Sequence, residues 1–121
     1  MRIAFIAHDD KKPALIEFVK GHAGLFEEFE CMATGTTGEQ LNEKTDLEVT
    51  GLESGSRGGD MAIGAAVAAD ECNAVIFFRD PLTAQPHEPD IMALLRVCDV
   101  HEIPLATNPT SADAIVSHLS E

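Results

Sequence analysis

The chain has 121 residues, 45% of them hydrophobic, and a formal net charge of −13 at pH 7. This length suits one domain with a single core, and no apolar run approaches the ~20 residues that span a membrane. Only eight Lys and Arg residues oppose 21 Asp and Glu residues, so the charge disfavours nucleic acid and anionic membranes as partners.

The acidic residues are scattered along the chain rather than gathered in a tail, which favours a folded acidic surface over disorder. Such a surface suits concentrated salt, because the Debye length falls to ~3 Å at ~1 M salt. The apolar start, Met1–Ala7, is too short for a signal peptide and is followed at once by His8-Asp9-Asp10. The sequence therefore predicts a cytoplasmic protein, and we hypothesise a cytoplasm rich in salt.

Short apolar runs alternate with helical patterns along the chain. The expected strands are Met1–Ala7, Phe29–Ala33, Leu47–Leu52, Ala74–Phe78 and Ile103–Thr107. The expected helices are Pro13–His22, Gly38–Lys44, Asp60–Ala69, Asp90–His101 and Ser111–Leu119, the last with Ser111 as its N-cap. Runs without polar alternation are typical of parallel strands covered by helices. Residues 1–121 are thus predicted to form a single-domain, doubly wound (Rossmann-like) α/β fold with a mainly parallel five-stranded sheet.

Polar clusters follow each expected strand. They are His8-Asp9, Thr34–Gly38, Ser54–Asp60, Arg79-Asp80 with His87, and Thr107-Asn108. Ligands of such sheets bind outside the carboxyl ends of the strands. We therefore expect the five clusters to form one pocket.

Two glycine-containing segments suit an anion, most simply phosphate. Ser54–Gly59 precedes a helix start, where unpaired N–H groups carry a partial positive charge. Thr34–Gly38 offers hydroxyls and further N–H groups, although alone it could equally be a turn with an N-cap, and it lacks the P-loop ending. Lys12 supplies a cation near the same edge.

The candidate proton-transfer groups are carboxylates and imidazoles. Asp60, Asp80 and Asp90 are candidate bases, and close carboxylates would raise one another's pKa. His8 and His87 are candidates for hydrogen bonding or proton transfer to a substrate oxygen. Structural alternatives are a buried strand-end histidine for His8 and an acidic helix start after His87.

The sequence predicts no metal and no organic cofactor. Cys31, Cys72 and Cys98 lack Cys-x-x-Cys spacing, so we expect buried reduced thiols. Cys98 and His101 could share a metal, but two ligands do not make a site. Metal-independent proton abstraction fits these residues best.

Taken in order, the clusters resemble the methylglyoxal synthase family over nearly the whole chain. The matching stretches are Ala7–Asp9 with Lys12, Ala33–Gly38, Ser54–Asp60, Phe77–Leu82, Pro86–Asp90, Ala93–Arg96 and Ile103–Asn108. The resemblance implies a carbon–oxygen lyase, usually a homohexamer, that converts dihydroxyacetone phosphate to methylglyoxal and phosphate. It implies Asp60, His87 and Asp90 as catalytic residues. The implied substrate-binding residues are His8, Asp9, Lys12, Thr34, Gly35, Thr36, Thr37, Ser54, Gly55, Asp80 and His87.

The chain departs from the family pattern in two places. Members often continue beyond the equivalent of Leu119 with an arginine that reaches a neighbouring subunit's phosphate site, whereas this sequence stops at Glu121. Arg57 stands in the glycine loop where an apolar residue can occur, and it either partly replaces that arginine or is a solvent-facing charge.

Two other functions are compatible with the expected fold. One is a non-catalytic module that binds phosphate or another effector, like the regulatory domain of carbamoyl-phosphate synthetase, because a fold does not decide function. Asp60, His87 and Asp90 occurring together favour the enzyme. The other is a receiver domain, but the sequence has no convincing pair of phospho-acceptor aspartate and late lysine.

We expect the melting temperature of the protein to rise with KCl concentration, because salt screens repulsion among its surface carboxylates. Thermal and urea melts at increasing KCl measure this effect. The absence of stabilisation by salt would contradict the hypothesis of a high-salt cytoplasm.

Overall fold

The computed structural model describes residues 1–121 and contains one sheet of five parallel strands in the order β3-β2-β1-β4-β5. The strands are β1 (Arg2–Ala7), β2 (Glu30–Thr34), β3 (Val49–Leu52), β4 (Ala74–Phe78) and β5 (Leu105–Ala106). Because all strands run the same way, their carboxyl ends meet at one edge of the sheet. The α/β prediction with a parallel five-stranded sheet is confirmed.

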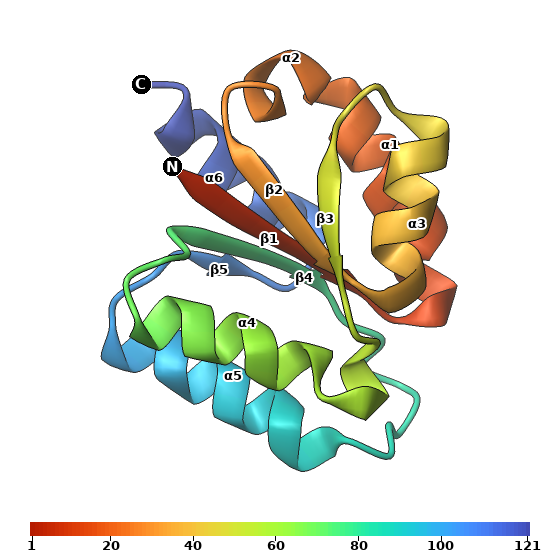
Figure 1. Cartoon of the computed structure of the whole chain (residues 1–121), viewed down its shortest axis with the longest axis vertical. Coiled ribbons are helices and arrows are strands. Elements are labelled where there is room, and N and C mark those ends of the chain that lie inside the picture. The colour runs from red at the N-terminus through yellow and green to blue at the C-terminus, as the bar shows by residue number, and fades with distance from the viewer.

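Helices cover both faces of this sheet (Figure 1). They are α1 (Lys12–Gly21), α2 (Ala23–Phe26), α3 (Gly35–Lys44), α4 (Gly59–Ala68), α5 (Glu88–Val100) and α6 (Pro109–Leu119). There are also two 3₁₀ turns. The first, η1 (Asp9–Lys11), follows β1, and the second, η2 (Gly55–Arg57), precedes α4. In Figure 1, α4 and α5 lie side by side on one face, and α1 and α3 lie on the other. No helix is both long and apolar enough to cross a bilayer.

The continuous apolar character of β1 follows from this double covering. Ile3 and Phe5 pack into the core on the side of α1, α3 and α6. Ala4 and Ile6 pack into the second core, on the side of α4 and α5. Alternate side chains of one strand therefore enter two cores, as expected for a parallel strand buried on both faces.

The start of α6 differs from the sequence prediction. The helix begins at Pro109, and Asn108 is its N-cap, with its side-chain Oδ1 accepting a hydrogen bond from the Ser111 N–H at 3.0 Å. The assignment of Ser111 as N-cap was therefore wrong. Asn108 has an extended backbone, and a proline suits the first helical position because it lacks the N–H that would stay unpaired there.

The boundaries of other helices and strands also differ from those predicted from the sequence. Helix α3 begins directly after β2 instead of at Gly38, α5 begins two residues before Asp90, and the short helix α2 was not predicted. Strands β3 and β5 are shorter than the apolar runs that contain them. Pro104 lies outside β5, but its carbonyl accepts a hydrogen bond from the Val75 N–H at 2.9 Å, so the run still pairs with β4.

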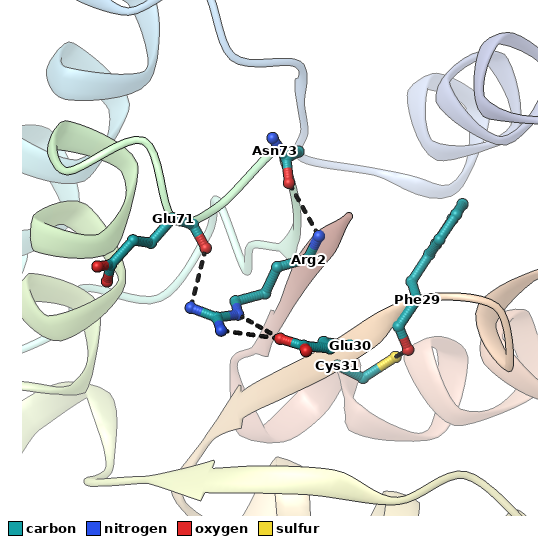
Figure 2. A network of polar contacts seen from close by, with 6 residues as sticks. All are labelled: Arg2, Phe29, Glu30, Cys31, Glu71 and Asn73. Atoms are coloured by element: carbon teal, nitrogen blue, oxygen red, sulfur yellow. Dashed lines mark hydrogen bonds and ion pairs between the residues drawn. The ribbon is translucent and has the colours of Figure 1, made fainter.

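A polar network ties the strand starts together at the edge of the sheet opposite the carboxyl ends. Figure 2 shows the Arg2 guanidinium donating to Glu30 Oε2 through Nε at 3.0 Å and Nη2 at 2.8 Å, and to the Glu71 carbonyl at 3.3 Å. The Arg2 N–H donates to Asn73 Oδ1 at 2.9 Å. The charge of Arg2 is thus committed to linking β1, β2 and the loop before β4.

The three cysteines are buried and unpaired, as predicted. Burial raises the pKa of Cys31 and of Cys98 to about 11, so both thiols are neutral at physiological pH. His101 is exposed while Cys98 is fully buried. No group of three or more His, Cys, Asp or Glu side chains is placed to hold a metal ion.

We expect Gly59→Ala to lower the free energy of unfolding by about 1–3 kcal/mol, the usual cost of overpacking. A Cβ at Gly59 would overlap the Glu53 carbonyl oxygen and lie 2.8 Å from Thr34 Cγ2. Gly64→Ala, in the same helix, is the matched control, since its Cβ would meet Val97 at an ordinary 3.5 Å. Urea titration should show the control as stable as wild type or more so, and equal stability of the two variants would contradict the prediction.

Candidate functional site

A cavity of about 190 Å³ opens at the carboxyl edge of the sheet. It lies where β1, β2 and β3 end, and the loop between β4 and α5 closes one side. Its wall consists of Ile6, Ala7, His8, Asp9, Lys12, Thr34, Gly35, Thr36, Thr37, Ser54, Gly55, Ser56, Asp60, Gln85, Pro86 and His87. The structure therefore brings together most of the predicted site residues.

The prediction of a single pocket from five clusters was wrong in part. Arg79, Thr107 and Asn108 line a different cavity. Conversely, Gln85 lies in the wall of the first cavity although sequence reasoning gave it no role, and Ser56, also in the wall, was included only as part of the segment Ser54–Gly59. Their signal was weak, because each is a single polar residue beside a glycine or proline already singled out.

A larger hollow of about 700 Å³ lies beside β2 and β3, but the site is not there. It is lined by Arg2, Glu30 and Glu48, among others, and the charge of Arg2 is already paired with Glu30 (Figure 2). The hollow contains none of the predicted site residues. The smaller cavity has the converging polar groups that ligand sites require.

The cavity wall brings backbone close to any occupant. Gly35 has a positive φ of 41°, and a Cβ there would lie 2.9 Å from Ser54 Cα. A Cβ at Gly55 would lie 2.8 Å from His87 Nε2 and 3.0 Å from Asp60 Oδ1. No side chain caps the first turn of α3, and its N–H groups have no partner inside the helix; that of Gly35 donates to the Glu53 carbonyl at 3.2 Å, which leaves the N–H groups after it. The segment is therefore a cradle of donors for an anion.

Lys12 is held in place beside this cradle. Its Nζ donates to the Ala7 carbonyl and to Asp9 Oδ1, both at 2.9 Å. The Lys12 side chain is 12% exposed and that of Asp9 is 97% exposed, and the hydrogen bond and charge of Lys12 lower the pKa of Asp9. An ammonium has three donors, so one N–H of Lys12 stays free for a ligand.

Asp60 is completely buried, and neither carboxylate oxygen accepts a hydrogen bond from the protein. The nearest cation-forming group is His87, whose Nε2 lies 3.5 Å from Asp60 Oδ2. Burial raises the pKa of Asp60, partly opposed by His87 and reinforced by the charge of Asp90. An unpaired carboxylate in a cavity wall can accept a proton from whatever binds there.

His8 presents its other nitrogen to the cavity. Its Nδ1 accepts a hydrogen bond from the backbone N–H of Asp80 at 2.8 Å, so a neutral His8 carries its proton on Nε2. That Nε2 is buried and has no partner within the protein. Burial lowers the pKa of His8, and the charges of His87 and Arg79 act in the same direction. His8 is thus a neutral hydrogen-bond donor facing the cavity.

Asp80 itself is not in the cavity wall, contrary to the sequence prediction. Its carboxylate Oδ1 instead accepts a hydrogen bond from the Leu82 N–H at 3.1 Å. The side chain therefore shapes the turn after β4. The backbone N–H of Asp80 orients His8, so its contact with the site is indirect.

Asp90 is also absent from the wall, whereas His87 is part of it. His87 is the N-cap residue of α5, and its carbonyl accepts a hydrogen bond from the Asp90 N–H at 2.9 Å. The loop that carries His87 is closed by Glu88, whose Oε1 accepts from the Gln85 N–H at 3.0 Å. Asp90 acts on the site through its charge, which adds to the raised pKa of Asp60.

Arg57 points away from the cavity. Its Nε lies 3.3 Å from Glu53 Oε2, and the two side chains are 77% and 67% exposed. Arg57 is not among the residues of the wall. This position favours the solvent-facing alternative over replacement of a phosphate-binding arginine.

Fold and site together define an α/β protein that can hold a small anion against a buried, unpaired carboxylate. The model of the MGS-like domain family matches residues 14–107, and the chain belongs to this family. It is 59% identical over 120 residues to a methylglyoxal synthase of Carboxydothermus hydrogenoformans, covering 99% of each chain. A methylglyoxal synthase of Clostridium botulinum is 55% identical, over 96% of this chain and 98% of its own.

A solved structure gives the same result. The crystal structure of methylglyoxal synthase from Elizabethkingia anophelis matches with a TM-score of 0.90 and 42% sequence identity, covering 96% of this chain and 76% of that chain. The family resemblance read from the motifs is confirmed.

We expect Asp60→Asn to raise the free energy of unfolding at pH 7 by about 0.5–2 kcal/mol, the range of single stabilising changes. Because the pKa of Asp60 is raised in the folded state, its ionisation costs stability. The cost is absent below the unfolded pKa of ~4, grows as pH rises from that value to the folded pKa, and is constant above it.

Urea titrations across this pH range measure the effect. Asp46→Asn, which removes the same charge from an exposed position, is the control for the general benefit of reducing net charge. A variant of Asp60 that is no more stable than the Asp46 variant at pH 7 would contradict the prediction.

Proposed function

We propose that this protein is a methylglyoxal synthase, a carbon–oxygen lyase that converts dihydroxyacetone phosphate to methylglyoxal and inorganic phosphate. The observation that carries the proposal is the buried, unpaired carboxylate of Asp60 beside a cradle of N–H donors. The methylglyoxal synthases that this chain matches over almost its full length support it.

In this proposal the cradle binds the phosphate group of the substrate. The binding residues are Thr34, Gly35, Thr36, Thr37, Ser54 and Gly55, with Lys12, which Asp9 holds in place. Local donors are needed because the whole chain carries a charge of −13, which repels a dianion at longer range. The remainder of the substrate then lies toward Asp60 and His87.

Asp60 acts as the base. Its carboxylate takes a proton from the hydroxymethyl carbon of the substrate, and the electrons of the C–H bond form the enediolate. His87, 3.5 Å from Asp60, donates a hydrogen bond to the oxyanion as charge develops. His8, whose Nε2–H faces the same cavity, adds a second hydrogen-bond donor of the kind that stabilises such charge.

Expulsion of phosphate follows from the geometry that the cradle imposes. When the bond between carbon and the phosphate oxygen stands out of the enediolate plane, it overlaps the π electrons and breaks. The electrons of the broken C–O bond leave with the phosphate, while the π electrons form a new C=C bond to that carbon and the former hydroxymethyl group loses its hydroxyl proton to become the aldehyde. The resulting enolate gains a proton on carbon to give methylglyoxal. His87 transfers the protons of this step, and Asp90, at the start of α5 and outside the cavity wall, acts on the site through its charge. Restraining the phosphate therefore decides the outcome of the reaction.

We extend the proposal to the setting of the enzyme. It works in the cytoplasm, as a homohexamer by its family resemblance, and phosphate binds as product and inhibitor. The acidic composition supports a high-salt cytoplasm. Neither a metal nor an organic cofactor takes part.

Purified protein incubated with dihydroxyacetone phosphate should release methylglyoxal and phosphate in equal amounts. Asp60→Asn is expected to lower kcat about 10²–10⁴-fold, the usual contribution of a general base. Asp46→Asn, with the same loss of charge at an exposed site, should retain wild-type activity.

Two outcomes would count against the proposal. An inactive wild-type protein that still binds phosphate would favour a non-catalytic effector module. Full activity of the Asp60→Asn variant would remove Asp60 as the base.

A further inference from the structure

A second cavity, of about 450 Å³, lies at the same edge of the sheet and shares no lining residue with the first. It is bounded by the ends of β4 and β5 and the starts of α1 and α6. Its wall consists of Lys11, Ala14, Phe78, Arg79, Pro81, Thr107, Asn108 and Pro109. No Asp or Glu lines it, although the chain contains 21 of them.

The wall contains two of the few cations that have no ion-pair partner. Of the eight Lys and Arg residues, four form salt bridges. Lys11 and Arg79, which line the cavity, belong to the unpaired four. A chain so short of positive charge therefore places two unpaired cations around one hollow.

Arg79 also carries a buried donor without a partner. Its Nε is inaccessible to solvent and forms no hydrogen bond within the protein. Leaving such a donor unpaired is costly, and more so for a charged group. The guanidinium lines the cavity, and its planar shape suits charge-assisted hydrogen bonds to an oxyanion there, which Nε can join when the side chain turns toward the ligand.

The remaining polar groups of the wall are suited to the same kind of ligand. Asn108 Oδ1 is occupied by the Ser111 N–H, which leaves the Asn108 side-chain NH₂ as a free donor. Thr107 contributes a hydroxyl group, and the N-terminus of α6, an 11-residue helix, faces the cavity through Asn108 and Pro109. The apolar lining, Phe78 with Ala14 and Pro81, leaves room for a small organic part.

We infer that this cavity is a second anion site, which binds a phosphate group, either inorganic phosphate or the phosphate of a small phosphorylated metabolite. The volume of about 450 Å³ lies within the range of small-molecule sites. The assignment does not depend on the reaction proposed for the first cavity, because the two sites share no residue.

One peptide unit connects the two cavities. Arg79 lines the second cavity, and the next residue, Asp80, donates its backbone N–H to His8 in the wall of the first. A ligand that shifts Arg79 therefore acts on the hydrogen bond that orients His8. Occupancy of the second site is thus expected to alter the first.

Amide NMR spectra of the whole protein, titrated with inorganic phosphate and separately with glycerol 3-phosphate, test the inference. We expect saturable shifts at Lys11, Arg79 and Asn108, distinct from any shifts at the cradle residues Gly35 and Gly55. Tighter binding of glycerol 3-phosphate would identify an ester as the ligand, and equal or weaker binding would identify inorganic phosphate. Titration with NaCl at equal ionic strength is the control for a general salt effect.

The decisive comparison is between two double variants that remove the same charge. Lys11→Met with Arg79→Met should weaken the second set of shifts about tenfold or more. Lys44→Met with Arg96→Met, which removes the two exposed unpaired cations, should leave those shifts unchanged. Arg79→Lys, which keeps the charge but loses the Nε donor, should weaken them to a smaller extent and serves if the Met variant does not fold.

Three results would overturn the inference. They are no saturable shift at Arg79 and Asn108, the same shifts produced by NaCl, or equal weakening in both double variants. Shifts confined to Gly35 and Gly55 would overturn the second site alone. Shifts confined to Arg79 and Asn108, in a protein inactive on dihydroxyacetone phosphate, would overturn only the proposed function.

Discussion

The burial of Asp60 without a hydrogen-bond partner is the constraint on which the site depends. It is possible because Gly55 and Gly59 allow η2, α4 and the end of β3 to approach more closely than any side chain would permit. Gly59 brings the start of α4 against the Glu53 carbonyl, and Gly55 leaves space for His87 beside the carboxylate. Close backbone contact thus keeps water away from the carboxylate without supplying the hydrogen-bond partners that a buried carboxylate normally has.

Stability and reactivity therefore oppose each other at this position. A carboxylate removed from water and from donors has a raised pKa, which makes it a better base and a worse structural residue. The surrounding fold compensates with two apolar cores, one on each face of the sheet. Beside His87, the carboxylate keeps a position that an asparagine would occupy at lower cost in stability.

The parallel five-stranded sheet and most of the cavity wall were predictable from the sequence, because buried strands are apolar throughout and polar residues follow each strand end. The strand order was not predicted. The directions in which individual side chains point could not be predicted. Asp80 lies two residues after β4, as Asp9 lies two residues after β1, yet the Asp80 carboxylate accepts a hydrogen bond from Leu82 while its backbone N–H donates to His8. Thr107 and Asn108 line another cavity because their strand, β5, lies beyond β4 at the edge of the sheet. The apolar sequence of a strand does not show which strands lie beside it.

The buried cysteines have a chemical consequence for an enzyme whose product is a reactive dicarbonyl. Thiolates are the side chains that such electrophiles attack most readily, and in this chain every thiol lies in the core. Burial raises the pKa of Cys31 and Cys98 to about 11, so near neutral pH both thiols are protonated as well as shielded. The protein releases an electrophilic dicarbonyl while presenting no exposed thiol of its own, so self-inactivation through addition of a cysteine thiolate to the carbonyl carbon is prevented.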